Sequence, residues 1–226
     1  NLGTIDVTTV LAKSSNVGTV KIALSLKPQE MWGALDELGF GRVTGSGFPG
    51  ESAGILTGYE HWRSIGQATM AYGYGLSVTP LQLAQAYAVL GAGGIRRPIS
   101  LRKVDAPPAG DSVVPEPVAR EIVQMLESVV SDTGTARRAA IMGYRVSGKT
   151  GTAWKASETG GYSTKKYMAV FGGVVPSSNP RLAAVVIIDE PSDGAYYGGE
   201  VAAPVFASVL SGALRLLAIP PDDLQP

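Results

Sequence analysis

The stretch KYMAVFGGVVPSSNPRLAAVVIID, residues 166–189, decides the fold class. It holds two apolar runs, residues 166–175 and 181–189, joined by the short link Pro176–Pro180. Runs rich in valine and isoleucine are typical of β-strands. The link is long enough for a hairpin but too short for the crossover that joins parallel strands. We therefore predict two antiparallel strands, and the second, nearly all apolar, is predicted to be central in the sheet.

A third strand is predicted upstream, over Gly148–Trp154. A final helix is predicted over Ala203–Leu217, and its apolar stripe is Val205, Val209 and Leu216. Before residue 143, apolar residues recur at helical spacing between glycine and proline turns. The helices predicted there span residues 6–13, 16–27, 28–38, 79–90 and 117–130. Helices combined with an antiparallel sheet define an α+β fold.

We predict one domain with two parts and a tail. Residues 1–142 form the mostly helical part, residues 143–217 form the strands and the final helix, and residues 218–226 form the tail. Residues 41–66, rich in glycine, serine and proline, are predicted to be a long packed loop, and residues 98–115 are predicted to be extended. The apolar stripes predicted on two of the helices are Leu83, Tyr87, Leu90 and Val118, Ile122, Met125, Val129.

Composition excludes several function classes. The 226 residues include 19 Lys+Arg and 19 Asp+Glu, so the formal net charge is +0, which argues against nucleic-acid binding. No cysteine is present, which excludes thiolate catalysis and cysteine zinc sites. The single histidine, His61, argues against a multi-histidine metal site, so no metal or organic cofactor is predicted. No apolar run approaches the roughly 18–20 residues of a membrane span, so no anchor is predicted in this chain.

Residues 143–150, GYRVSGKT, match the P-loop pattern of nucleotide-binding proteins letter for letter. A phosphate loop must open a helix, because amides at the helix N-terminus face the phosphates. Residues 151–161, GTAWKASETGG, have no helical stripe, and the hairpin contradicts a parallel nucleotide-binding sheet. We expect no nucleotide site here; a helix beginning at Thr150 would restore that interpretation.

The same residues have a second interpretation, as a strand that lines a cleft. Side chains alternate along a strand, so Lys149 and Gly151 share one face. Glycine there lets a peptide approach the strand edge and pair with it. The ammonium of Lys149 can hold a carboxylate or polarise a hydroxyl. The alternative is an ordinary exposed strand end, for which a Lys-Thr-Gly sequence alone is not decisive.

Ser14 and Asn16 lie at the junction of two predicted helices. They offer a hydroxyl and an amide to one cleft if Ser15 points away. The alternative is helix capping, for which serine and asparagine are common residues.

Taken together and in this order, Ser14-Ser15-Asn16 and Lys149-Thr150-Gly151-Thr152 resemble the second and third motifs of the penicillin-binding proteins and serine β-lactamases. Longer stretches resemble the transpeptidase domain of class B penicillin-binding proteins: GFGRVTGSGFPGESAGIL (39–56), YGYGLSVTPLQLAQAYAVLGAGG (72–94) and GYRVSGKTGTAWK (143–155). The stretch KSSNVGTVKIAL (13–24) is most similar to the septal, cell-division type of that class.

The resemblance implies a serine D,D-transpeptidase that cross-links peptidoglycan stem peptides through an acyl-enzyme and is a target of β-lactams. It implies that Ser14 passes a proton to the leaving amine, that Asn16 binds the substrate's amide carbonyl, and that Lys149 supports Ser14 electrostatically. The backbone N–H of Thr152 is implied to be an oxyanion donor. The implied substrate-binding residues are Thr150, Gly151, Thr152, Tyr167, Tyr196 and Tyr197. For the three tyrosines, ordinary half-buried aromatics are the alternative.

The sequence departs from the family in one respect. The family's nucleophile lies in a Ser-x-x-Lys segment upstream of Ser-x-Asn, and no such segment precedes Ser14. Copies at residues 100–103 and 163–166 come later, in segments predicted to be extended, where Ser and Lys do not share a helical face. His61, in the predicted loop, is no substitute. We expect a C-terminal piece of a transpeptidase domain, inactive alone, whose nucleophile segment is another chain, was cleaved away or is not represented.

Other functions remain open at this point. Within the family, a D,D-carboxypeptidase or β-lactamase would use water in place of the amine. From another class, a non-catalytic penicillin-binding or scaffold domain would keep the motifs. The partners implied are stem peptides, β-lactams, the missing N-terminal part of the domain and other division proteins, with no nucleic acid. The implied location is the periplasmic face of the bacterial inner membrane.

Overall fold

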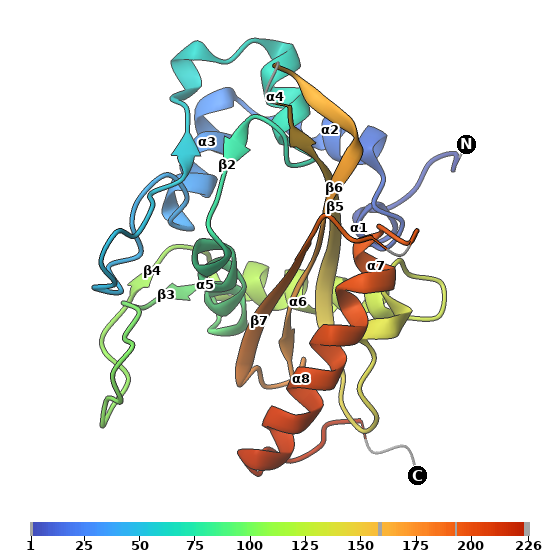
Figure 1. The fold of residues 1–226 in the computed structure, drawn as a ribbon. Helices are drawn as coiled ribbons and strands as arrows, with labels where there is room; N and C mark the ends of the chain where they lie inside the picture. The colour runs from blue at the N-terminus through green and yellow to red at the C-terminus, as the bar shows by residue number, and fades with distance from the viewer. Residues whose placement is uncertain (1, 158–159, 193, 224–226) are drawn as a thin grey trace.

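The computed structural model describes residues 2–157, 160–192 and 194–223 (Figure 1). Helices dominate the chain before residue 143, and the long strands come after it, as the sequence predicts. The elements are, in chain order, α1 (Val7–Ala12), α2 (Asn16–Ser25), α3 (Pro28–Glu37), β1 (Ile55–Leu56), η1 (Tyr59–His61), α4 (Ser64–Met70), β2 (Leu76–Ser77), α5 (Pro80–Gly91), β3 (Ile95–Arg96), β4 (Asp111–Ser112), α6 (Glu116–Val130), η2 (Arg137–Ala139), β5 (Ser147–Ala156), β6 (Tyr162–Val175), β7 (Leu182–Asp189), α7 (Gly198–Val201) and α8 (Ala203–Leu216).

The C-terminal third of the chain forms a three-stranded antiparallel sheet in the order β5-β6-β7. In its register Lys149 lies opposite Gly172, and Val170 lies opposite Ile187. The predicted hairpin and the α+β class are confirmed, although the middle strand begins earlier than predicted, at Tyr162. The prediction of a central third strand is wrong, because β7 pairs only with β6 in the described part of the chain.

Helices cover both faces of the sheet. Phe171 of β6 packs edge-to-face on Phe206 of α8, with ring centroids 4.8 Å apart. Gly172 is the next residue and so faces the other side of the sheet. A Cβ there would lie 2.3 Å from the ring of Tyr87 on α5, so glycine lets the tyrosine ring lie directly on the strand. α8 therefore covers one face and α5 the other.

α6 buries a face that is displaced from the predicted stripe. Ala119, Val123 and Leu126 are buried, whereas Val118, where the predicted stripe begins, is 44% exposed. Val129 is fully buried, and it is the one residue of the predicted stripe that also belongs to the observed buried face. The helix carries two adjacent apolar stripes, and packing against the sheet selects between them.

α8 likewise buries a different face from the predicted one. Phe206, Leu210 and Leu214 are buried in the main hydrophobic core. The residues of the predicted stripe are instead exposed: Val205, Val209 and Leu216. The helix is apolar on nearly all sides, so the spacing alone did not identify the buried face.

α5 begins with the predicted capping box. Thr79 Oγ1 accepts from the Gln82 N–H, and Gln82 Oε1 accepts from the Thr79 N–H over 2.7 Å. The most buried side chains of the helix include Gln82 and Gln85. The predicted stripe is only partly buried: Leu83, Tyr87 and Leu90. Glutamine occupies the buried face because the carbonyl groups of the neighbouring loop need donors there.

The predicted loop over residues 41–66 contains three short elements that the sequence did not reveal: β1, η1 and the start of α4. β1 pairs with β2, with Ile55 opposite Ser77. α4 has only seven residues and no side-chain hydrogen bond at its N-cap, so neither length nor capping signals it. The prediction that the loop is packed is only partly confirmed: the carbonyls of Arg42 and Ala53 bond to Gln82, but most residues of 41–54 are exposed, with Phe48 65% exposed.

One helical stretch in the described residues, Gly198–Leu216, is long and apolar enough to cross a membrane. This stretch is α7 followed by α8. In the structure it lies against the sheet, with Phe206 in ring contact with Phe171. The packing of this helical stretch against the sheet explains part of its apolar composition.

Candidate active site

Two segments from distant parts of the chain meet beside β5 (Figure 1). Ser14 lies in the turn between α1 and α2, and Lys149 lies on β5. Lys149 Nζ donates to Ser14 Oγ over 2.8 Å, across 135 residues of sequence. The structure therefore brings together the serine and the lysine that the sequence analysis singled out.

Ser15, rather than Ser14 or Asn16, caps α2. Its Oγ accepts from the Gly18 N–H over 3.2 Å. The capping alternative thus applies to Ser15 only. Ser14 and Asn16 are both exposed at the surface of this turn. No hydrogen bond of the Asn16 side chain is recorded among the described residues, so its predicted role remains untested.

Lys149 is half-buried, and burial lowers its pKa to about 8 because the ammonium loses water. Nζ also donates to the backbone carbonyl of Thr150 over 3.0 Å. With a pKa of about 8, the side chain is mostly protonated at neutral pH. It therefore presents a cation to Ser14 Oγ, which makes removal of the serine proton easier.

β5 begins at Ser147, inside the residues that match the P-loop pattern, and continues as a strand past Thr150 to Ala156. A phosphate loop would begin a helix at Thr150, and the structure has a strand there, so the nucleotide-binding interpretation fails. The register places Lys149 and Gly151 on one face of the strand, and Thr150 and Thr152 on the other. β5 pairs only with β6 in the described residues, so the Lys-Thr-Gly segment lies at a sheet edge, as expected.

Gly198, beside β5, and Gly151, on β5, have different roles. Gly198 N donates to Thr152 Oγ1 over 3.1 Å, and a Cβ on Gly198 would lie 2.2 Å from the carbonyl oxygen of Val170. Glycine is needed there for α7 to begin so close to the sheet. A Cβ on Gly151 would meet only Val170 Cβ, at an ordinary 3.5 Å. The described residues therefore leave open the position that a Gly151 side chain would take, whereas α7 lies against the Gly151 carbonyl, because a Cβ on Gly198 would come within 2.5 Å of that oxygen.

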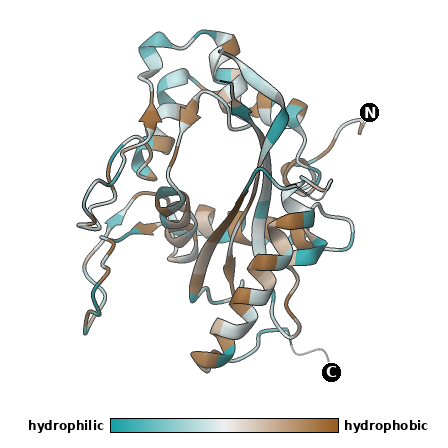
Figure 2. Cartoon of the chain, in the orientation of Figure 1, coloured by the Kyte–Doolittle hydropathy of each residue, from teal (hydrophilic) through white to brown (hydrophobic). Residues whose placement is uncertain are grey.

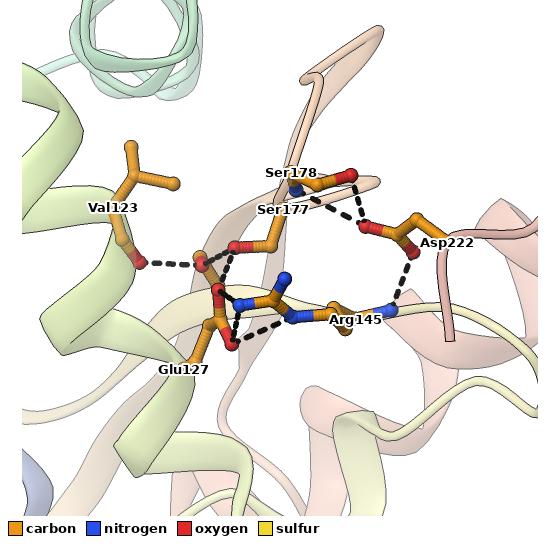
Figure 3. Close-up of polar contacts among 7 residues, drawn as sticks. Val123, Glu127, Arg145, Ser177, Ser178 and Asp222 are labelled. Atoms are coloured by element: carbon orange, nitrogen blue, oxygen red, sulfur yellow. Dashed lines mark hydrogen bonds and ion pairs between the residues drawn. The ribbon is translucent and has the colours of Figure 1, made fainter. Parts of the chain in front are cut away.

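A network of hydrogen bonds fastens the start of β5 to α6 and to the β6–β7 hairpin (Figure 3). Ser147 is fully buried, and its Oγ lies 2.6 Å from both the Val123 carbonyl oxygen and Ser177 Oγ. Ser177 donates to Glu127 over 2.5 Å, and Glu127 forms a two-pronged ion pair with Arg145. These bonds fix the first residue of β5, and so the position of the lysine that follows on the strand.

The predicted C-terminal tail is held at the same corner (Figure 3). Asp222 accepts from the Arg145 N–H over 2.8 Å and from Ser178 Oγ over 2.7 Å. Tyr144 donates to the carbonyl of Ile219 over 2.6 Å. The segment after α8 is therefore docked through at least residue 222.

The three tyrosines singled out from the sequence lie together. The rings of Tyr167 and Tyr196 stack, with centroids 4.1 Å apart and planes 17° apart. Tyr196 donates to Tyr197 over 3.2 Å, and this bond raises the pKa of Tyr196 to about 12. Tyr197 is the N-cap of α7, directly before the Gly198 that bonds to Thr152. The tyrosine cluster therefore borders the end of the Lys-Thr-Gly-Thr segment.

Neither copy of Ser-x-x-Lys forms a helix. Ser100 is exposed between β3 and β4, and its Oγ donates to the Arg102 carbonyl. Ser163 is on β6, and its Oγ accepts from the Lys166 N–H. His61 ends η1 and is exposed. Across the described ranges, no group of three His, Asp or Glu side chains gathers as a possible metal site.

Two contacts at the site involve residues that sequence reasoning missed. Lys13 Nζ donates to the Thr133 carbonyl over 2.6 Å, and Thr135 Oγ1 lies 3.1 Å from Thr150 Oγ1. Both place residues 131–136, the turn between α6 and η2, beside the motifs. No local pattern marks these residues, because Lys13 and Thr133 are 120 residues apart.

The α+β fold and the Ser–Lys contact at a sheet edge are features of the penicillin-binding protein class, and comparison with known proteins agrees. Residues 1–211 match the family model described as penicillin binding protein transpeptidase domain. The chain belongs to this family.

Named relatives and a solved structure give the same result. The chain is 46% identical over 220 residues to peptidoglycan D,D-transpeptidase FtsI of Escherichia coli K12, covering 97% of the chain and 37% of that protein. It is 41% identical over 221 residues to FtsI of Buchnera aphidicola, covering 98% of the chain and 39% of that protein. The apo transpeptidase domain of Burkholderia pseudomallei penicillin-binding protein 3 matches with a TM-score of 0.93 and 46% identity, covering 100% of the chain and 68% of that domain. The chain thus spans well under half the length of these two curated relatives.

Proposed function

We propose that the chain is part of a serine D,D-transpeptidase that cross-links peptidoglycan stem peptides in septal cell-wall synthesis and is a target of β-lactams. The observation that carries this proposal is the 2.8 Å contact between Lys149 Nζ and Ser14 Oγ at the edge of β5. Relatives named peptidoglycan D,D-transpeptidase support the reaction type. The likeness to a penicillin-binding protein 3 domain supports the septal branch.

In the proposed reaction, a serine nucleophile attacks the carbonyl carbon of the D-Ala-D-Ala amide. The serine hydroxyl loses its proton as its oxygen forms the ester, and the C–N bond breaks. A proton reaches the leaving D-alanine amine through Ser14, so the amine gains the proton that the serine hydroxyl loses. The amine of a neighbouring stem peptide then attacks the ester, loses a proton and releases the serine. The Lys149 ammonium stabilises the developing charge on Ser14 Oγ while the proton moves.

The remaining motif residues hold the substrate in this proposal. Asn16 binds an amide carbonyl, and the hydroxyls of Thr150 and Thr152 bind the terminal carboxylate. Gly151 leaves room for an extended backbone to lie along the strand edge, and the Thr152 N–H is one oxyanion donor. The tyrosine cluster forms a wall at the end of this groove. The open position where a Gly151 side chain would lie supports the arrangement.

We also propose that the nucleophilic serine and its lysine come from polypeptide outside these 226 residues. Neither Ser-x-x-Lys segment of the described chain contacts Ser14 or Lys149. α2, which follows the Ser14 turn, has uncovered apolar side chains, with Val17 68% exposed and Leu24 48% exposed. A further segment packed against α2 would cover them, as burial of apolar surface requires.

β7 supports the same proposal. Every residue from Leu182 to Ile188 is apolar (Figure 2), and all of them are only half-buried, although alternate residues pack against the hydrophobic core. Long apolar edge strands are rare in native proteins, because their free backbone groups invite pairing. The solved penicillin-binding protein 3 domain extends beyond the 68% that this chain matches. A strand from the rest of such a domain would pair with the free edge of β7.

Labelling with a fluorescent penicillin tests both proposals. The full-length protein should become covalently labelled on a denaturing gel, and the 226-residue chain alone should not. Ser14→Ala and Lys149→Ala should slow labelling of the full-length protein, by roughly 10²–10⁴-fold for the proton-transfer residue. Ser100→Ala and Ser163→Ala are the matched controls and should label normally. An unlabelled full-length protein would overturn the transpeptidase proposal, and a labelled isolated chain would overturn the external nucleophile.

The proposed location is the periplasmic face of the bacterial inner membrane, supported by the family's substrate, which lies outside that membrane. A full-length fusion to a reporter that matures only in the periplasm should be active. Activity of a cytoplasm-dependent reporter at the same position would contradict the assignment.

A further inference from the structure

The turn over residues 131–136, SDTGTA, lies between the two motifs of the site. On one side, Lys13 Nζ donates to the Thr133 carbonyl over 2.6 Å, and Lys13 directly precedes Ser14. On the other side, Thr135 Oγ1 lies 3.1 Å from Thr150 Oγ1. The turn therefore connects the segment that carries Ser14 with the strand that carries Lys149.

The backbone of this turn is firmly held. The Ala136 N–H donates to the Val129 carbonyl over 2.8 Å, and the Ala136 side chain is fully buried. A Cβ on Gly199 of α7 would lie only 2.1 Å from the Thr135 carbonyl oxygen, so α7 begins directly against the turn. Thr135 is thus fixed on both sides, and its hydroxyl is presented to Thr150 by a rigid support.

The hydrogen-bonding capacity of the Thr150 hydroxyl is limited to one donated and two accepted bonds. The Lys149 ammonium has only donors, and its Nζ lies 3.4 Å from Thr150 Oγ1, so this contact uses one acceptor position. If Thr135 donates as well, both acceptor positions are used. The Thr150 proton is then left over for a ligand in the groove.

We propose that Thr135 is a positioning residue that donates to Thr150 Oγ1 and thereby leaves the Thr150 proton free to donate to the carboxylate of an acyl donor. This inference rests on the proposed function. It adds a residue outside the Ser-x-Asn and Lys-Thr-Gly motifs to the recognition of the substrate's negative charge. It makes a specific prediction, because the Thr150 proton contributes more to binding a charged carboxylate than to binding the neutral carbonyl of an ester.

The test compares benzylpenicillin with its methyl ester, which lacks the negative charge. The second-order rate of acylation is measured for the full-length protein with each compound. Thr135→Val should slow acylation by benzylpenicillin about tenfold, the loss expected from one hydrogen bond, and slow acylation by the neutral ester by a smaller factor. Thr135→Ser keeps the hydroxyl and should restore the rate with benzylpenicillin. Ser131→Ala is the control in the same turn, since Ser131 Oγ bonds to the Ser128 carbonyl and to Thr133 Oγ1 and makes no hydrogen bond to Thr150 within the described residues.

Each outcome decides a different point. Equal slowing of both compounds by Thr135→Val, or slowing of neither, overturns the role of Thr135 while the proposed function stands. A wild-type protein that neither compound acylates overturns the proposed function and the inference with it. Thermal melting of each variant shows whether it is folded, and Thr135→Ala, which also lacks the hydroxyl, tests the inference if the valine variant is not folded.

Discussion

Ser14 has a backbone φ of 51°, in the left-handed region that residues other than glycine seldom occupy. A side chain there costs roughly 1–2 kcal/mol, and such strain gathers at functional sites. The turn between α1 and α2 imposes it, with the Ser14 N–H donating to the Leu11 carbonyl and the Ser15 N–H to the Val10 carbonyl. Serine at this position therefore lowers stability, which is consistent with a residue retained for its hydroxyl.

Ser14→Gly and Ser14→Ala separate the strain from the hydroxyl. Both variants lose the hydroxyl, and both should slow acylation of the full-length protein by penicillin. Glycine adopts the left-handed conformation without strain, so Ser14→Gly should be more stable than Ser14→Ala by about 0.5–1 kcal/mol. Urea unfolding measures the difference. A more stable alanine variant would contradict the strain argument, and a glycine variant with the full acylation rate would contradict the role of the hydroxyl.

Lys149 should make stability depend on pH. Its pKa is about 8 in the folded chain against 10.5 as the ordinary value. Between these values the unfolded chain binds more protons, so the free energy of unfolding should rise with pH. Below about pH 8 both states are protonated and the cost of burying the ammonium is constant. From pH 7 to pH 9.5, the urea midpoint of the wild-type protein should rise more than the urea midpoint of Lys149→Met. Equal changes in the two midpoints would show that the lysine is not desolvated.

At the scale of elements, α5 fastens the long loop before it. Gln82 is fully buried, and its amide donates to the carbonyls of Arg42 and Ala53, each over 2.8 Å. Its Oε1 accepts from the Thr79 N–H, which closes the capping box. One side chain thus caps the helix and satisfies two carbonyls of the loop through partly buried hydrogen bonds.

Gln82→Met should release this loop. The carbonyls of Arg42 and Ala53 would lose their donor, at a cost of about 1–3 kcal/mol. Amide hydrogen exchange should speed up across residues 41–54. Gln85→Met is the matched control on the same helix, because Gln85 makes only a long 3.4 Å bond to the Arg97 carbonyl. Equal effects of the two variants would show that α5 does not hold the loop through Gln82.

β5 should be equally sensitive at its first residue. Ser147→Ala removes the buried hydroxyl that meets Val123 and Ser177, so unfolding should become easier by about 1–3 kcal/mol. Ser25→Ala removes an exposed hydroxyl that donates to the Ile22 carbonyl, and should change stability by less than about 0.5 kcal/mol. Chemical denaturation measures both. A Ser147→Ala variant as stable as the Ser25→Ala control would show that the network does not anchor the strand.

Sequence patterns predicted an element best where residues adjacent in the sequence determine that element. The capping box at Thr79 and the short link at 176–180 identified α5 and the hairpin, because each is determined by neighbouring residues. The buried faces of α6 and α8 were not predictable, because both helices are apolar on more than one side and packing selects the face. The edge position of β7 was missed for a related reason, since an apolar run indicates burial without naming its neighbours.

At the scale of the whole molecule, the site is formed by segments that meet only in the folded chain. Motif order identified Ser14 and Lys149, and the fold places them 2.8 Å apart. The contacts of Lys13 and Thr135 could not be predicted, because single lysines and threonines in turns carry no signal of long-range contact. The Ser147–Glu127 network was equally hidden, since it joins α6, β5 and the hairpin through side chains that are distant in sequence.

Two apolar surfaces of the chain are uncovered at this scale. The apolar face of α2 and the edge strand β7 are the surfaces that additional polypeptide of the same domain would cover. The same polypeptide would carry the nucleophile to the groove beside Ser14. Covering of the apolar surfaces and completion of the site are therefore expected to occur together.

The most direct test maps the penicilloyl group on the full-length protein by digestion and tandem mass spectrometry after reaction with benzylpenicillin. The adduct should lie on a serine outside these 226 residues, and Lys149→Ala should sharply reduce its yield. An adduct on Ser14, Ser100 or Ser163, or on any other residue of this chain, would contradict the account.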